Sequence, residues 1–197
     1  MNASSDMAGA LVYVMGPSGA GKDSVLGRAR AMLSIDLPVV FAHRYITRPH
    51  DIGGENHVAL SPSEFALRRA HGLFTFHWQA HGNDYGIGHE IEAWRDAGLA
   101  VVVSGSREHF RTMDGVDKDT VPVLITAPAE RLKERLLKRG REDADAAAER
   151  LQRGLAYDLD VAGAVTITND GALDEAAEAF VRLLATLRHS PAVRRRA

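Results

Sequence analysis

Short apolar runs recur along the chain, and most of them have the length of a buried strand. They predict core strands at residues 10–15, 37–43, 99–103, 121–125 and 164–168, and a further strand at 73–78. Between these runs, apolar residues recur at the spacing of one helix face. This spacing predicts helices at residues 22–33, 61–70, 90–96, 128–138, 145–157 and 173–188. Strands that alternate with helices are typical of an α/β protein, here with a five-stranded parallel sheet flanked by helices.

Polar segments interrupt this alternation at three places. Residues 44–61 contain Pro49 and two glycines and predict mostly loop, and residues 81–86 are rich in turn-forming residues. Residues 139–143 form a charged break between two predicted helices. We find no internal repeat and no linker, so the pattern predicts one domain with inserted segments.

Composition narrows the class of protein. The 197 residues can bury one sizeable core, and 45% apolar with 25% charged residues is ordinary for a globular domain, which excludes a disordered or fibrous chain. No apolar run approaches the roughly 20 residues of a membrane span, and the polar N-terminus does not resemble a secretory signal. The chain has no cysteine, which excludes disulfides and thiolate zinc sites and suits the cytoplasm.

Charge adds little to this picture. The net charge of −2 gives no reason to expect nucleic acid as a partner. Of the 24 basic residues 20 are arginines, which fits the codon usage of a GC-rich genome and permits an anionic substrate without requiring one.

The strongest chemical signal is the segment Gly-Pro-Ser-Gly-Ala-Gly-Lys at residues 16–22. It matches G-x-x-x-x-G-K and lies between a predicted strand and a predicted helix, which is the context that this motif requires. The glycines let the backbone curl so that its N–H groups face phosphate oxygens, and Lys22 is expected to reach the β- and γ-phosphates. The residues expected to bind the nucleotide are Gly16, Pro17, Ser18, Gly19, Ala20, Gly21, Lys22, Asp23 and Ser24.

The residue after Lys22 departs from the motif. A Ser or Thr there would ligate Mg²⁺, but this chain has Asp23, and Ser24 projects about 100° further around the helix. The predicted strands at 99–103 and 121–125 do not end in the Asp that usually provides a second ligand. We therefore expect Asp23 to supply an oxygen to Mg²⁺, and the alternative is that Asp23 only caps the helix.

Four short motifs, in the right order along nearly the whole chain, resemble those of the guanylate kinase family. They are residues 16–22, Thr47-Arg48-Pro49, the segment from His81 to Gly86, and Arg135 to Gly140 with Arg150 behind it. The resemblance implies a P-loop kinase fold in a single domain over residues 1–197. It implies a core at about 10–40, 98–134 and 160–190, an acceptor-binding insert at about 41–97 and a lid at about 135–150.

The departures from guanylate kinases concern the groups that read the base. Where that family has two carboxylates that contact guanine, this chain has Ser104 and Ser106. Arg44 stands where the family usually has a small hydroxyl residue. The loss of base-reading groups and the gain of a cation favour an acceptor that has an extra phosphate and no base.

This pattern is similar to the ribose 1,5-bisphosphate phosphokinases of bacterial phosphonate utilisation. The shared segments are residues 21–24, 44–49, 55–57 and 105–107. The resemblance implies that ATP, with Mg²⁺, phosphorylates the 1-phosphate of ribose 1,5-bisphosphate to give 5-phosphoribosyl 1-diphosphate and ADP. The alternatives are a guanylate kinase, or a guanylate-kinase-like binding module without catalysis.

The resemblance also implies the roles of individual residues. The transferred group is expected to be neutralised by Lys22, Arg135, Arg139 and Arg150. The acceptor is expected to contact Arg44, Arg48, His57, Tyr85, Ser104, Ser106 and Arg107. The expected partner is a small phosphosugar, with no nucleic acid or membrane, for a cytoplasmic monomer or homodimer.

Overall fold

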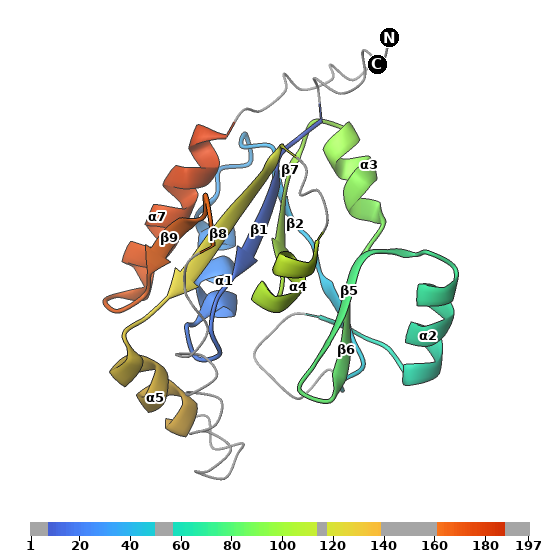
Figure 1. Cartoon of the computed structure of the whole chain (residues 1–197). Coiled ribbons are helices and arrows are strands. Elements are labelled where there is room, and N and C mark those ends of the chain that lie inside the picture. The colour runs from blue at the N-terminus through green and yellow to red at the C-terminus, as the bar shows by residue number, and fades with distance from the viewer. Residues whose placement is uncertain (1–7, 50–56, 114–117, 139–160, 188–197) are drawn as a thin grey trace. The chain divides into compact units, whose positions relative to one another are not determined.

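The computed structural model of the chain describes residues 8–49, 57–113, 118–138 and 161–187, without the side chains of 136–138 (Figure 1). The chain divides into two compact units. The first comprises residues 1–13, 35–120 and 186–197, and the second comprises residues 14–34 and 121–185. Within the described residues no helix has the length and apolar character needed to cross a membrane.

Five parallel strands form one sheet in the order β2-β7-β1-β8-β9. They are β1 (Leu11–Met15), β2 (Val39–Phe41), β7 (Ala100–Ser104), β8 (Thr120–Thr126) and β9 (Val165–Thr168). All residues of β1 and β7 are buried, as their unbroken apolar runs predict for inner strands of a parallel sheet. The predicted five-stranded parallel sheet is thus confirmed.

The helices agree closely with the apolar spacing of the sequence. The described helices are α1 (Lys22–Met32), α2 (Pro62–Ala70), α3 (Glu90–Asp96), α4 (Arg107–Thr112), α5 (Ala129–Lys138) and α7 (Leu173–Thr186). At the start of α2, the side chain of Ser61 accepts a hydrogen bond from the Glu64 N–H (3.2 Å), which confirms the predicted cap. The helix expected at 145–157 lies outside the described residues, and the sequence patterns did not predict α4.

A second sheet, with the order β4-β3-β6-β5, lies within the first unit. Its strands are β3 (Arg44–Ile46), β4 (Val58–Ala59), β5 (Phe74–Ala80) and β6 (Asn83–Gly88). The prediction of mostly loop at residues 44–61 was wrong for β3 and β4, and the turn-rich segment 81–86 includes the first residues of β6. The reason is tertiary pairing, since β6 pairs antiparallel with both β3 and β5.

Gly86 shows why composition was misleading in this segment. A Cβ added to Gly86 would lie 2.7 Å from Cδ1 of Phe74, so glycine is needed here for close packing between β5 and β6. Phe74 in turn stacks on Phe65 of α2, with ring centroids 4.6 Å apart, and both are buried with Leu60. This aromatic cluster fixes α2 against the second sheet.

The second unit has its own apolar layer. In α7, the buried residues Ala176, Ala177, Phe180 and Leu184 recur at helical spacing. In α1, Val25, Leu26 and Ala29 are buried on one face. The phosphate-binding motif at 16–22 belongs to this unit, whereas all the residues expected to contact the acceptor belong to the first unit.

Candidate functional site

The loop at 16–22 has the setting that the sequence predicts, because it follows β1 and leads into α1 (Figure 1). Gly19 and Gly21 adopt left-handed conformations, with φ of 87° and 81°. A Cβ added to Gly16 would lie 2.0 Å from the carbonyl oxygen of Ile125. The curled backbone of this loop therefore depends on its glycines, as expected for a phosphate-binding loop.

Two polar side chains support the loop from outside the motif. The Asn169 amide nitrogen donates to the carbonyl oxygen of Ala20 (2.8 Å), and an Arg135 guanidinium nitrogen donates to the same oxygen (3.4 Å). Asn169 follows β9, is buried, and donates its backbone N–H to Thr126 at the end of β8 (2.7 Å). The loop is thus tied to the ends of two neighbouring strands.

The N-cap of α1 is Gly21, which has no side chain to cap the helix. Asp23 lies in the first turn and is half-buried, together with Lys22, whereas Ser24 is exposed. Asp23 is therefore not the N-cap itself, and a carboxylate in the first turn also stabilises the helix through its dipole, so both roles expected of Asp23 stay open. Among the described residues no three His, Asp or Glu side chains form a metal-binding group, but Mg²⁺ bound to a nucleotide often uses only one or two carboxylates. A single carboxylate at Asp23 therefore fits such an ion.

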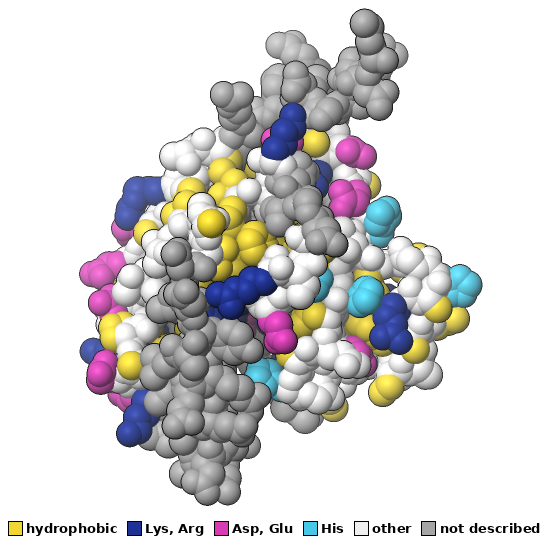
Figure 2. Space-filling model, in the orientation of Figure 1, with side chains coloured by type: hydrophobic (Ala, Val, Ile, Leu, Met, Phe, Trp, Pro, Cys, Tyr) yellow, Lys and Arg dark blue, Asp and Glu magenta, His cyan; other side chains and the backbone are white. Residues whose placement is uncertain are grey.

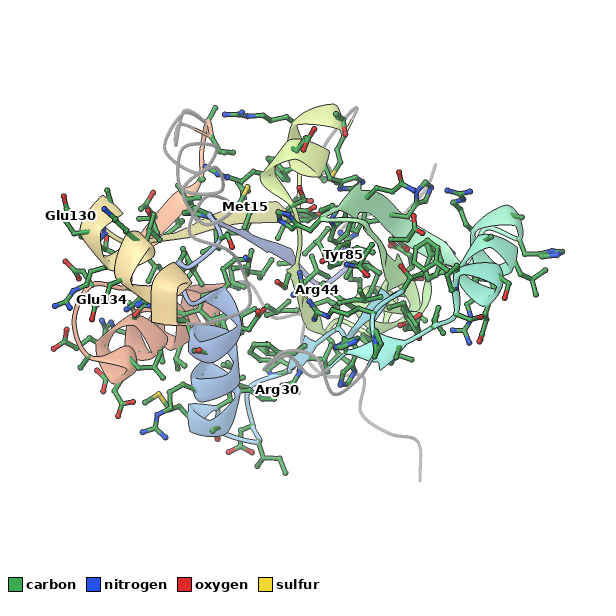
Figure 3. The ribbon with its side chains drawn as sticks, turned by 90° about the horizontal axis from the view of Figure 1, so that it is seen from below. Met15, Arg30, Arg44, Tyr85, Glu130 and Glu134 are labelled. Carbon is green, nitrogen blue, oxygen red and sulfur yellow. The ribbon has the colours of Figure 1, made fainter. Side chains whose placement is uncertain are left out.

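In the first unit, Arg44 and Tyr85 meet on neighbouring strands β3 and β6 (Figure 3). The guanidinium carbon of Arg44 lies 5.6 Å from the centre of the Tyr85 ring. On the sheet, the two residues are diagonal neighbours, because Arg44 pairs with Ile87 and Ile46 pairs with Tyr85. A cation over an aromatic face keeps its charge while its position is restricted, so this pair is suited to holding a phosphate.

Tyr85 is held from β5 by Trp78. The two rings are stacked, with centroids 5.5 Å apart and an angle of 6° between their planes. The two residues pair directly across β5 and β6. Trp78 was not predicted as a site residue, although its place on a strand beside the turn-rich segment was a usable signal.

The segment with Thr47 and Arg48 is fixed to the second sheet by hydrogen bonds. Thr47 donates its N–H to the Asp84 carbonyl (3.1 Å) and accepts the Asp84 N–H on its hydroxyl oxygen (2.8 Å). His57, which is 2% exposed, donates from Nε2 to the carbonyl oxygen of Arg48 (3.1 Å). His57 therefore contacts the backbone that presents Arg48.

The end of β7 carries three further residues expected to contact the acceptor. Ser104 is buried, and its hydroxyl has no hydrogen-bond partner among the described residues. Ser106 is the N-cap of α4, and its hydroxyl oxygen accepts the His109 N–H (3.4 Å). Arg107 is the first residue of α4. Ligands of α/β sheets bind at the carboxyl ends of the strands, where Ser104 offers a neutral hydroxyl.

The remaining expected site residues divide by position. Arg135 contacts the phosphate-binding loop at Ala20, whereas Arg139 and Arg150 lie outside the described residues. On the face drawn in Figure 2, the described Lys and Arg side chains form small separate groups among acidic and apolar ones.

Comparison with known proteins adds independent findings. Residues 12–153 match the family model described as an AAA domain. A ribose 1,5-bisphosphate phosphokinase PhnN from Desulfomicrobium baculatum is 49% identical over 88% of this chain and 93% of its own. Proteins of the same name from Dickeya zeae and Burkholderia pseudomallei are each 48% identical, over 89% and 91% of this chain and 93% and 97% of their own.

A solved structure is similar in fold. The crystal structure of guanylate kinase from Anaplasma phagocytophilum matches with a TM-score of 0.63 and 20% identity, over 91% of this chain and 86% of that one. This likeness shows a guanylate-kinase-like P-loop fold. The identities near one half over most of the chain show that the chain belongs to the ribose 1,5-bisphosphate phosphokinase family of kinases.

Proposed function

We propose that this chain uses ATP to phosphorylate the 1-phosphate of ribose 1,5-bisphosphate, giving 5-phosphoribosyl 1-diphosphate and ADP. The family supports this reaction. The structural observation that carries it is the character of the acceptor residues: Arg44 lies over Tyr85, and the end of β7 offers the neutral Ser104 in place of a carboxylate. Arg44 would attract a second phosphate, and the end of β7, which lies among the described residues, offers guanine no carboxylate.

The size of this preference follows from the hydrogen bonds that guanine would lose. Carboxylates accept charge-assisted bonds from the guanine ring N–H and amine, each worth about 1.5–3 kcal/mol. The loss of two such bonds costs roughly two to four orders of magnitude in binding. The absence of two negative charges also reduces the repulsion of a second phosphate. Both effects favour the bisphosphate over GMP.

The proposed chemistry needs little from the protein besides positioning. An oxygen of the 1-phosphate is ionised at pH 7, so it attacks without a general base. The new bond joins this oxygen to the γ-phosphorus of ATP, while the bond from that phosphorus to the β–γ bridging oxygen breaks and ADP leaves. The protein therefore has to hold two anions in line and neutralise the charge between them.

We assign this neutralisation to the phosphate-binding loop and the arginines near it. Lys22 binds the β- and γ-phosphates, and Arg135, Arg139 and Arg150 complete the positive charge around the transferred group. Mg²⁺, held by Asp23 and by the nucleotide, would supply further positive charge. We place the acceptor phosphates on Arg44, Arg48, Tyr85 and Arg107, with Ser104 and Ser106 beside the sugar and His57 fixing Arg48.

The proposal also includes the domain organisation of the kinase and the compartment in which it works. A single kinase domain, with an acceptor insert at about 41–97 and a lid at about 135–150, would carry it out. Both substrates are small phosphorylated metabolites of the cytoplasm, so we place the reaction there.

The direct test is to identify the product. Purified protein, ATP, MgCl₂ and ribose 1,5-bisphosphate are incubated and followed by ³¹P NMR. We expect the 1-phosphate signal to be replaced by two coupled signals of a diphosphate ester, together with ADP. Lys22→Ala, which removes the cation expected at the β- and γ-phosphates, should give no product. ADP formation without a new diphosphate ester on the acceptor would overturn the proposal.

A further inference from the structure

The hydroxyl of Tyr13 on β1 lies beside the turn that carries the expected acceptor residues. It accepts the N–H of Ser106 (3.2 Å), and it lies 3.0 Å from Nδ1 of His109 and 3.2 Å from the Ser106 carbonyl oxygen. Tyr13 is fully buried, as expected for a core residue in an apolar run, but its hydroxyl has these polar partners.

One proton on the Tyr13 hydroxyl limits how these contacts can be used. Since the Ser106 N–H donates to this oxygen, the hydroxyl proton is left for one acceptor, and the shorter contact is to Nδ1 of His109. His109 then carries its own proton on Nε2. The hydroxyl thus joins the N-cap of α4 to a side chain in the same helix, three residues further along.

The turn also packs against the Tyr13 ring. A Cβ added to Gly105 would lie 2.1 Å from Cζ of Tyr13 and 2.2 Å from its hydroxyl oxygen. Only a glycine can approach the ring so closely. Tyr13 therefore fixes the turn Ser104–Arg107 both through hydrogen bonds and through packing of its ring.

Aromatic neighbours restrict both side chains. The Tyr13 ring lies 5.1 Å from Phe110 and 5.8 Å, edge to face, from Phe76. His109 lies 5.4 Å from Trp78, the residue that stacks on Tyr85. A continuous row of side chains thus runs from the Ser104–Arg107 turn to Arg44, through Tyr13, His109, Trp78 and Tyr85.

The protonation states agree with this arrangement. Burial raises the pKa of Tyr13 well above its usual range, so its hydroxyl keeps its proton. Burial, and then the nearby His77, lowers the pKa of His109, so its ring is neutral near pH 7 and can accept at Nδ1.

We propose that Tyr13 and His109 are positioning residues for the acceptor: they fix the Ser104–Arg107 turn and, through Trp78 and Tyr85, hold it at a set separation from Arg44. This role rests on the proposed function. A substrate with phosphates at both ends needs its two binding groups at one separation, which a rigid row of rings provides. Loss of the Tyr13 hydroxyl should therefore weaken acceptor binding and leave ATP binding intact.

The test compares two tyrosines that each lose one hydroxyl. Tyr13→Phe keeps the ring packing and removes the hydrogen bonds. The matched control is Tyr45→Phe, because the Tyr45 hydroxyl donates to Glu90 (3.3 Å) in the same unit but outside the row. We expect Tyr13→Phe to raise the KM for ribose 1,5-bisphosphate about tenfold, with the KM for ATP changed less than about twofold. Tyr45→Phe should change neither.

Histidine variants test the partner. His109→Phe keeps an aromatic ring and removes only the bond that the two side chains share, so it should show part of the effect of Tyr13→Phe, which also loses the bond from the Ser106 N–H. The double variant should be no worse than Tyr13→Phe alone. His109→Asn places a polar atom near Nδ1 and should restore part of the acceptor affinity. Additive effects of the two substitutions, or an acceptor KM in Tyr13→Phe equal to that of Tyr45→Phe, would overturn the proposal.

A measurement without substrate separates this proposal from the proposed function. In Tyr13→Phe, amide hydrogen exchange at residues 106–110 should be at least about tenfold faster than in the wild type, and Tyr45→Phe should leave it unchanged. If the wild type does not turn over ribose 1,5-bisphosphate, the proposed function fails, and exchange alone decides whether the pair fixes the turn. Equal exchange rates in Tyr13→Phe and the wild type would refute the proposal that Tyr13 and His109 fix the turn.

Discussion

Replacing Gly21 with alanine should damage the phosphate-binding loop in two ways that can be separated. Gly21 has a φ of 81°, and alanine in this left-handed conformation costs about 1–2 kcal/mol. The new Cβ would also lie 2.5 Å from Nδ2 of Asn169. Asn169 is buried and would have to give up its hydrogen bond to Ala20 (2.8 Å), and a buried amide left unsatisfied costs about 1–3 kcal/mol. The expected loss in the free energy of unfolding is therefore about 2–5 kcal/mol.

Gly163→Ala is the matched control for this experiment. Gly163 lies in the same unit and has a φ of 75°, but a Cβ there meets no atom within 4 Å. Urea unfolding should show a loss of about 1–2 kcal/mol for Gly163→Ala, with an unchanged KM for ATP. Gly21→Ala should lose about 1–3 kcal/mol more and raise the KM for ATP at least about tenfold. Equal losses in both variants, with normal ATP affinity, would refute the role given to the Asn169 contact.

Three further predictions concern single side chains. Lys22→Ala should abolish phosphate transfer while the circular dichroism spectrum and unfolding curve stay as in the wild type, and near-normal turnover would contradict the loop assignment. Asp23→Ala should raise the Mg²⁺ concentration for half-maximal rate more than it raises the KM for ATP, and an unchanged Mg²⁺ requirement would exclude the metal role. Because burial and then His77 lower the pKa of His109, the unfolded chain binds a proton that the folded chain does not, so the free energy of unfolding should fall as the pH drops below about 6.5. Urea unfolding at pH 7 and pH 5 should show a smaller fall for His109→Phe, and an equal fall would show that His109 does not contribute.

The parallel sheet and its helices were predictable because their signals are local. Apolar runs such as residues 100–103 are buried on both faces, and the helix predicted at 90–96 has the same bounds in the structure. The second sheet was not predictable from such signals. Strand β3 has three residues and begins with Arg44, and its conformation is set by pairing with β6, which lies about forty residues further along the chain.

The candidate site was predictable only where its residues belong to a sequence motif. The loop at 16–22 carries its own motif, so its position between β1 and α1 followed from the sequence. The residues that support the site carry no motif. Asn169 follows a strand end, Tyr13 lies in an apolar run, and His109 is a half-buried residue of a helix of only six residues. Their roles depend on contacts between segments far apart in the sequence.

The central claim is that the acceptor is a small bisphosphate, and its most direct test is the ratio of two specificity constants. ADP release is measured with ribose 1,5-bisphosphate and with GMP under the same conditions. We predict that kcat/KM for ribose 1,5-bisphosphate exceeds that for GMP by at least about a hundredfold. Arg44→Ala should weaken the bisphosphate more than any monophosphate tested. Efficient phosphorylation of GMP, with ribose 1,5-bisphosphate inert, would contradict the claim and identify a guanylate kinase.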